Sequence, residues 1–385
     1  MKLTDASQEI RKFTNKYKDN INYKGLTKQR VTIMKELFGI MKTSYRNKPI
    51  IQQDTNYAYI QPTYNYSIPE TIRDDIQNKF RHMYKTVYVY DKRIISVQLY
   101  NDQIMDDKHL KNIHNKIQNW LYIATKNAQN ECSSKLDIHI YFTKHKKYMP
   151  DKHEPIDTIN ANTAFTTACT RDTDIHIFRS EEWFKVLIHE TFHSLGLDFS
   201  NMNDNISNIR LQNIFSINTT NLRLYESYCE AWAEIWNLII ISFYSVKDKT
   251  NFDIMVHRFE CMLQEEIFFS MYQAHKVLSN SDITYKELVH TKENVYVEKT
   301  KAFSYFIVKP ILLYNINDFL TWCKRSNKPM ILFKKTDANI EKYCDLIEKL
   351  SKDTKYINDF RFFENNSTGD IVDENSLRMT VFEFI

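Results

Sequence analysis

The sequence predicts an α+β protein whose carboxyl-terminal half is mainly helical. Three patterns lead to this fold class. Short segments rich in β-branched and aromatic residues lie in the first half of the chain, a strand pattern leads directly into a helix near residue 180, and apolar residues then recur at helical spacing. The chain has 385 residues, of which 43% are hydrophobic. This is enough for one large domain or two ordinary ones with a buried core.

The first 130 residues combine helical and extended patterns. Residues 1–48 are helical and basic in pattern. Residues 55–70, "TNYAYIQPTYNYSIPE", predict extended chain and loop because prolines and polar residues interrupt the aromatic side chains. Alternating β-branched and aromatic residues around a polar turn predict a hairpin within 86–100. Apolar residues at helical spacing then predict a helix over 109–129.

The later segments change from strands to helices. Strand patterns cover 136–143 and 174–179. The helices expected after them cover 181–195, 225–246, 252–278, 297–314 and 338–351. This change of pattern predicts an amino-terminal region of unassigned role, a central domain and a carboxyl-terminal appendage. Their expected bounds are 1–130, 131–315 and 316–385.

Composition and charge narrow the classes of partner. The net charge of +4 comes from 52 basic and 48 acidic residues, which gives no reason to expect nucleic acid or an anionic membrane as a partner. The longest apolar run, residues 238–244, is too short to cross a bilayer, and the start of the chain lacks the apolar segment of a secretory signal. Irregularly spaced cysteines without a CxxC pair predict reduced thiols in an intracellular protein. The cysteines are Cys132, Cys169, Cys229, Cys261, Cys323 and Cys344.

The stretch "KVLIHETFHSLGLDFS", residues 185–200, carries the clearest chemical signal. His189 and His193 stand four apart, and positions i and i+4 share one face of a helix, so both imidazoles can bind one zinc ion. Glu190 is turned about 100° around the helix from His189. Its carboxylate can therefore accept the proton of an attacking water instead of binding the metal. This HExxH pattern is typical of metallopeptidases.

Local signals place these residues in a helix. Ser180 is a suitable N-cap and Gly196 a natural residue to end the helix, so we expect a helix over 181–195. The alternative interpretation is a helix with two unrelated histidines, because a pattern of three fixed residues also arises by chance in chains of this length.

A catalytic zinc site needs three protein ligands and an open position. The stretch resembles the HExxHxxGxxH pattern of the matrixin-type metzincin proteases at four positions. The matching residues are His189, Glu190, His193 and Gly196. Phe199 stands where that pattern has its third histidine and cannot bind zinc, Asp198 is one position away, and no Met-turn follows. A third ligand is therefore expected elsewhere.

The segment "YESYCEAWAEIW", residues 225–236, supplies acidic candidates on a predicted helix. In gluzincin proteases a glutamate from a later helix is the third ligand, and an acid four residues further on orients a zinc histidine. The segment is also similar to the glutamate helix of lethal-factor-type toxin proteases, E-x-x-A-E-A-aromatic. This resemblance implies Glu226 as ligand and Glu230 as the orienting acid. The exchanged assignment stays open, and Glu234 is a less favoured third choice.

Two further roles have weaker candidates. "NTAF", which begins at Asn162, resembles the N-A-aromatic element of thermolysin-like enzymes, so Asn162 is a candidate for holding a substrate carbonyl; an ordinary loop asparagine is the alternative. A donor to the tetrahedral oxyanion is also expected. Tyr305 is the chosen candidate, beside His275 and His290, and a core role is the alternative for each.

Residues 155–315 as a whole resemble uncharacterised metallopeptidase-like proteins of large DNA viruses. The resemblance implies a zincin-like catalytic domain over 131–315, a Zn²⁺ cofactor, and a location in the host cytoplasm or the virus particle. The first functional hypothesis is a gluzincin-type zinc metalloendopeptidase acting on polypeptides. The alternative is a catalytically inactive zincin-like structural or binding protein, as Phe199 would allow. A third possibility is hydrolysis of a non-peptide amide.

Overall fold

The computed structural model divides the chain into two compact units, and each is described by itself. The helical unit comprises Met1–Phe38, Tyr148–Ala161 and Met202–Ile385, and the sheet unit comprises Gly39–Lys147 and Asn162–Asn201. The structure describes residues 3–47, 49–63, 65–219, 222–291, 296–366 and 375–383. These units do not coincide with the three regions expected from the sequence, which stay a prediction about domains.

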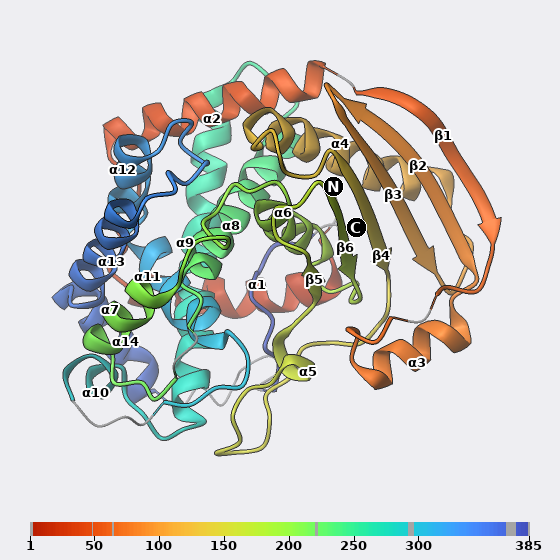
Figure 1. Ribbon diagram of the computed structural model, residues 1–385. Coiled ribbons are helices and arrows are strands. Elements are labelled where there is room, and N and C mark those ends of the chain that lie inside the picture. Colours follow the sequence, from red (N-terminus) through yellow and green to blue (C-terminus); the bar gives the residue numbers. More distant parts are fainter. Residues whose placement is uncertain are drawn as a thin grey trace. The chain divides into compact units, whose positions relative to one another are not determined.

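The described part of the sheet unit contains a six-stranded mixed sheet (Figure 1). Its strands are β1 (Ile50–Tyr59), β2 (His82–Tyr90), β3 (Arg93–Asn101), β4 (Lys135–Tyr141), β5 (Ala164–Thr166) and β6 (Asp172–Ile177). Their order is β1-β2-β3-β4-β6-β5. The first three are antiparallel neighbours, β3, β4 and β6 run parallel, and β5 is antiparallel to β6. The hairpin expected within 86–100 is confirmed by β2 and β3.

Two helices cover one face of this sheet. α4 (Asp107–Asn127) contacts β2 through His114, whose Nδ1 lies 2.6 Å from the hydroxyl oxygen of Tyr88. α6 (Trp183–Ser194) contacts β5, β6 and α4. Alternate residues of each strand point to this face and form its apolar core. Those without exposed surface include Ile95, Val97, Leu99, Leu136, Ile138, Ile140, Ile175 and Ile177.

The opposite face of the sheet carries a row of stacked rings. His139 of β4 and His176 of β6 stack with ring centroids 4.5 Å apart, and Tyr100 of β3 stacks on Tyr141 of β4 at 4.5 Å. Phe165 of β5 extends the row, 4.9 Å from His176. Burial lowers the pKa of His139 to about 4 and also lowers the pKa of His176. Both rings are therefore neutral near pH 7.

The helical unit is built around α9 (Phe252–Ser279), which contacts α1, α8, α11, α14 and the π-helical segment η2 (Figure 1). The other elements of this unit are α1 (Asp5–Tyr17), η1 (Lys18–Asn20), α5 (Thr158–Ala161), α7 (Asn205–Ile214), α8 (Tyr225–Ser245), α10 (Tyr285–His290), η2 (Phe303–Val308), α11 (Lys309–Tyr314), α12 (Ile316–Ser326), α13 (Asp337–Ser351) and α14 (Thr354–Asn365). α2 (Lys28–Arg46) spans the division after Phe38, and α3 (Glu70–Lys79) belongs to the sheet unit.

Residues 377–382 of the carboxyl-terminal segment are buried in the helical unit. The carboxylate of Glu266 on α9 accepts hydrogen bonds from the backbone N–H groups of Val381, at 2.8 Å, and Phe382, at 3.0 Å. Lys309 Nζ donates to the carbonyl oxygen of Met379 at 2.8 Å. Burial, together with the neighbouring Glu234, raises the pKa of Glu266 to about 8. Glu266 on α9 and Lys309 on α11 thus hold this segment through its backbone.

The α+β class is confirmed, and most helices lie close to their expected positions. α8 and α9 begin at Tyr225 and Phe252, as expected. The helix expected over 297–314 begins later, at Phe303, because the Glu298 carboxylate accepts the Phe303 N–H at 2.5 Å and holds the preceding chain in another conformation. No helix in the described part of the chain has the length and apolarity that a membrane crossing requires.

Candidate metal centre

The chain enters α6 differently from the expectation. The helix begins at Trp183, its N-cap is Glu182 in a left-handed conformation with φ 61°, and Ser180 is not the cap. Instead, the Ser180 hydroxyl donates to the carbonyl oxygen of Thr143 at 2.7 Å. The buried Glu182 carboxylate pairs with the buried ammonium group of Lys147. A buried ion pair and a side-chain hydrogen bond therefore attach the helix start to the chain after β4.

The two motif histidines converge on one point. His189 Nε2 and His193 Nε2 are 3.1 Å apart, the rings are inclined by 78°, and the residues are 5% and 7% exposed. Two nitrogens bound to one tetrahedral zinc ion at ordinary distances are about 3.3 Å apart. The spacing of these two atoms therefore suits ligation of a single metal ion, and both belong to residues that could hold one.

Asp198 orients one of these imidazoles. Its Oδ2 accepts a hydrogen bond from His193 Nδ1 at 2.5 Å, and its Oδ1 accepts one from the Ser200 hydroxyl at 2.9 Å. Asp198 is fully buried. A proton on Nδ1 leaves the lone pair of Nε2 for a metal, and such carboxylate–histidine pairs are common behind metal ligands. In the sequence Asp198 is notable only as the neighbour of the position of a third histidine, because its contact with His193 depends on the turn after the helix.

Glu190 follows His189 on α6 and is 8% exposed. The helix rotation sets its side chain about 100° from that of His189. Glu190 is the one acidic residue of α6.

The end of α6 agrees with the sequence. Gly196 follows the helix at φ 68°, its N–H donates to the His193 carbonyl oxygen at 3.1 Å, and the Leu197 N–H donates to that of Phe192 at 2.8 Å. These two bonds define a Schellman motif with glycine in the left-handed position. The turn directs the chain back toward the helix, which brings Asp198 within reach of the His193 ring.

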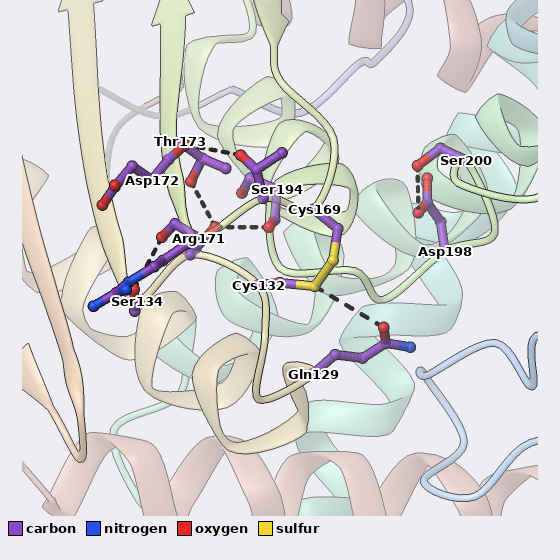
Figure 2. The surroundings of a disulfide bond; sticks show 12 residues. Gln129, Cys132, Ser134, Cys169, Arg171, Asp172, Thr173, Ser194, Asp198 and Ser200 are labelled. Carbon is purple, nitrogen blue, oxygen red and sulfur yellow. Dashed lines mark hydrogen bonds between the residues drawn. A yellow bond between two sulfur atoms is a disulfide. The ribbon is translucent and has the colours of Figure 1, made fainter.

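One pair of cysteines corrects the expectation of reduced thiols. Cys132 and Cys169 form a disulfide, with Cα atoms 4.6 Å apart and a sequence separation of 37 (Figure 2). Their spacing gave no sign of a pair. Cys132 lies shortly before β4 and Cys169 shortly before β6, and these strands meet as parallel neighbours, which brings both cysteines together. The cysteines outside this disulfide are Cys229, Cys261, Cys323 and Cys344.

The acidic candidates for the third ligand lie on α8. Glu226, Glu230 and Glu234 are 6%, 4% and 0% exposed. Glu234 Oε1 accepts a hydrogen bond from the Thr380 hydroxyl at 2.8 Å, and its Oε2 lies 3.8 Å from Lys309 Nζ. Glu234 is thus engaged by Thr380 and Lys309 within the helical unit. α8 belongs to the helical unit and α6 to the sheet unit, and a metal ion held by both helices is a proposal.

The weaker candidates are distributed over both units. Asn162 precedes β5 in the sheet unit, and its carbonyl oxygen accepts a hydrogen bond from Arg179 Nε at 2.9 Å. Tyr305 lies half-buried on η2 of the helical unit. His275 on α9 is half-buried with a pKa lowered by burial, and His290 is exposed at the end of α10. Nothing in these positions singles out an oxyanion donor.

Comparison with known proteins returns no match: no family model, no curated protein and no solved structure is similar to this chain. The functional assignment therefore rests on the residues of the chain itself.

Proposed function

We propose that this protein is a zinc-dependent metallopeptidase of the gluzincin type with a zincin-like fold. The observation that carries the proposal is the convergence of His189 Nε2 and His193 Nε2, 3.1 Å apart, with the second ring oriented by Asp198. Neutral imidazoles are preferred zinc ligands, and an oriented imidazole is preorganised for binding. The donor set of the motif helix thus fits zinc.

In this proposal Glu226 supplies the third ligand, with Glu230 as the alternative. A buried carboxylate on an apolar helix is stabilised by a cation or another partner, and α8 presents such carboxylates four residues apart. When bound, zinc would supply Lewis-acid polarisation of a peptide carbonyl and of the attacking water. Asp198 would hold His193 in place, supported by a hydrogen bond from Ser200, and Glu230 stays the proposed orienting acid on α8.

The chain's own residues would move the proton and bind the substrate. Glu190 would take the proton from the attacking water and transfer it to the leaving amine, so no covalent intermediate with the chain is needed. Asn162 beside the edge strand β5 would hold a substrate carbonyl, and Tyr305 would donate a hydrogen bond to the developing oxyanion. The substrate class is a polypeptide, with a non-peptide amide as a variant of the same chemistry.

The proposed location is the host cytoplasm or a virus particle. The Cys132–Cys169 disulfide fits the particle better, because the cytosol keeps most thiols reduced.

A second function is favoured by Phe199. This residue is 1% exposed and stands where a related protease pattern has its third histidine. A zincin-like scaffold without catalysis, serving a structural or binding role in a virus particle, would keep the apolar packing and lose the ligand. This candidate predicts that Glu190 has no chemical role.

A test compares the wild-type chain with Glu190→Gln for zinc content and for cleavage of a mixed peptide library. A metallopeptidase keeps about one zinc per chain in both proteins, and its peptide cleavage falls by at least about a hundredfold in the variant. The scaffold hypothesis instead predicts no cleavage by either protein. Cleavage by both at equal rates would contradict the role of Glu190 and point to another catalytic group.

A further inference from the structure

The disulfide lies against the carboxyl-terminal end of the helix that carries both motif histidines. We propose that Cys132–Cys169 is a redox-sensitive clamp on α6, and that its reduction by a dithiol loosens the end of this helix and weakens metal binding by His189 and His193. The clamp itself follows from contacts within the sheet unit, whereas the effect on metal binding rests on the proposed function.

The two cysteine-bearing loops hold the last carbonyl groups of the helix. The Cys169 N–H donates to the carbonyl oxygen of His193 at 3.0 Å, and the Gln129 N–H donates to that of Leu195 at 3.1 Å. Between them, the Ser133 hydroxyl donates to the carbonyl oxygen of Ser194 at 2.6 Å. The final carbonyls of a helix have no partner inside it. Here three successive ones are bonded by residues at or next to the disulfide.

The same loops connect the helix end to the sheet. Ser133 Oγ also lies 2.6 Å from the hydroxyl oxygen of Thr173 on β6, and the Ser133 N–H donates to the carbonyl oxygen of Thr170 at 2.6 Å. Figure 2 shows Ser194 of the helix facing Thr173 of the strand in this bridge. The disulfide closes the bridge covalently, so that the loop before β4 and the loop before β6 hold the helix end together.

The disulfide also fits tightly under the turn that follows the helix. A Cβ atom added to Gly196 would lie 2.6 Å from Cys132 Sγ and 3.3 Å from Cys169 Sγ. Only glycine leaves room for the sulfur pair at this point. Two residues later the chain reaches Asp198, which holds the imidazole of His193. A shift of the disulfide is thus transmitted through the turn to a carboxylate that orients a candidate metal ligand.

The exposure of the two cysteines determines which sulfur atom a reductant attacks first. Cys132 is fully buried and Cys169 is partly exposed. A thiolate of the dithiol attacks the Cys169 sulfur, forms a mixed disulfide there, and releases Cys132 as a thiolate that takes up a proton. The second thiol of the reductant then attacks its own sulfur in the mixed disulfide and releases Cys169. The chain gains two electrons and two protons in all, and the dithiol becomes a cyclic disulfide.

The loop before β4 keeps other attachments after reduction. Arg93 of β3 donates from Nη2 to the Gln129 carbonyl oxygen at 2.6 Å and from Nε to that of Cys132 at 3.3 Å. Reduction therefore releases the loop before β6, which carries Cys169, from the loop before β4, which Arg93 still holds. The hydrogen bond from Cys169 to His193 is the one we expect to weaken, since its donor loses its covalent anchor.

The experiment uses the full chain in two states, oxidised and reduced by dithiothreitol that is then removed without air. Free-thiol counting by mass spectrometry verifies each state. The first readout is amide hydrogen exchange of peptides covering residues 189–198 in metal-free protein. The second is the rate at which added zinc is released to a chromophoric chelator. Cys261→Ser, which removes an exposed free thiol on α9, is the matched control. Cys132→Ala combined with Cys169→Ala should behave like reduced protein and ignore dithiothreitol.

We expect reduction to speed exchange of these amides by about tenfold or more and zinc release by about tenfold or more, equally in wild type and Cys261→Ser. Unchanged exchange after complete reduction overturns the clamp. Faster exchange with unchanged zinc release overturns its coupling to the metal. If neither state binds zinc, the proposed function fails, while the exchange readout still decides the clamp. If the double variant does not fold, the comparison of oxidised and reduced wild-type protein still tests the clamp.

Discussion

The two units bury ionisable groups of opposite kind. In the helical unit, burial raises the pKa of Glu266 and of Glu298 to about 8, so both carboxyl groups are protonated at neutral pH. In the sheet unit, burial lowers the pKa of His114 and of His139 to about 4, so both imidazoles are neutral there. At these four positions the buried group is therefore uncharged near pH 7: the two carboxyl groups by holding a proton, the two imidazoles by releasing one.

This difference gives the units opposite responses to pH. Between about pH 4.5 and pH 8 the unfolded helical unit has lost protons that the folded one keeps, so its stability falls as pH rises through this range. Between pH 6.5 and about pH 4 the unfolded sheet unit binds protons that the folded one rejects, so its stability falls as pH falls. The candidate metal helix lies in the unit that acid weakens and that a disulfide supports.

The largest expected effect is a loss of stability in the sheet unit alone, because this unit contains the disulfide. Replacing both Cys132 and Cys169 by Ala should lower the free energy of unfolding of the sheet unit by about 4 kcal/mol, because a loop of this length is no longer constrained in the unfolded chain. The helical unit should keep its stability. Hydrogen exchange of peptides from β4 and from α9 along a urea series measures the two units separately. Equal losses in both would show that they unfold as one body.

The next effect tests the pH contrast in the helical unit. Glu266→Gln keeps the shape of the side chain but cannot ionise. Wild-type protein should lose on the order of 3 kcal/mol of stability between pH 5 and pH 8 through this group, and the variant should lose much less. Labelling of buried thiols along a urea series reports unfolding of this unit. The thiols are Cys229, Cys323 and Cys344.

The matched variant for the sheet unit is His114→Gln. Wild-type protein should lose about 2 kcal/mol of sheet-unit stability between pH 7 and pH 5 through His114, and the variant should lose less. Exchange of β4 peptides, corrected for the intrinsic pH dependence, measures this. A loss of stability in the same pH direction for both units would break the comparison.

A smaller effect concerns the orientation of the candidate ligand. Asp198→Asn keeps a side chain of the same shape but removes its charge and accepts a weaker hydrogen bond from His193 Nδ1. We expect zinc affinity to fall about tenfold, as for other groups that orient metal ligands. Competition titration against a chelator gives the dissociation constant, and Ser200→Ala, which removes one hydrogen bond to Asp198, should have a weaker effect. Unchanged affinity in Asp198→Asn would remove this residue from the site.

Sequence patterns predicted most of the helices and the β2–β3 hairpin because these elements depend on local periodicity. They also predicted the turn at Gly196, which needs a left-handed residue. The disulfide and the role of Asp198 depend on which segments meet in space, and no spacing rule revealed them. The predicted helix start at residue 181 was wrong, and the helix begins at Trp183. A buried ion pair between Glu182 and Lys147, 35 positions apart, holds the chain at the start of the helix, and no local cap does so.

The most direct test of the central claim is the zinc content of the purified chain, measured by elemental mass spectrometry beside His193→Ala. The account predicts about one zinc per wild-type chain and loss of that zinc in the variant. Both proteins should be folded by circular dichroism. Absence of zinc from the wild-type chain after zinc has been supplied, or equal zinc in both proteins, would contradict a metal centre at His189 and His193.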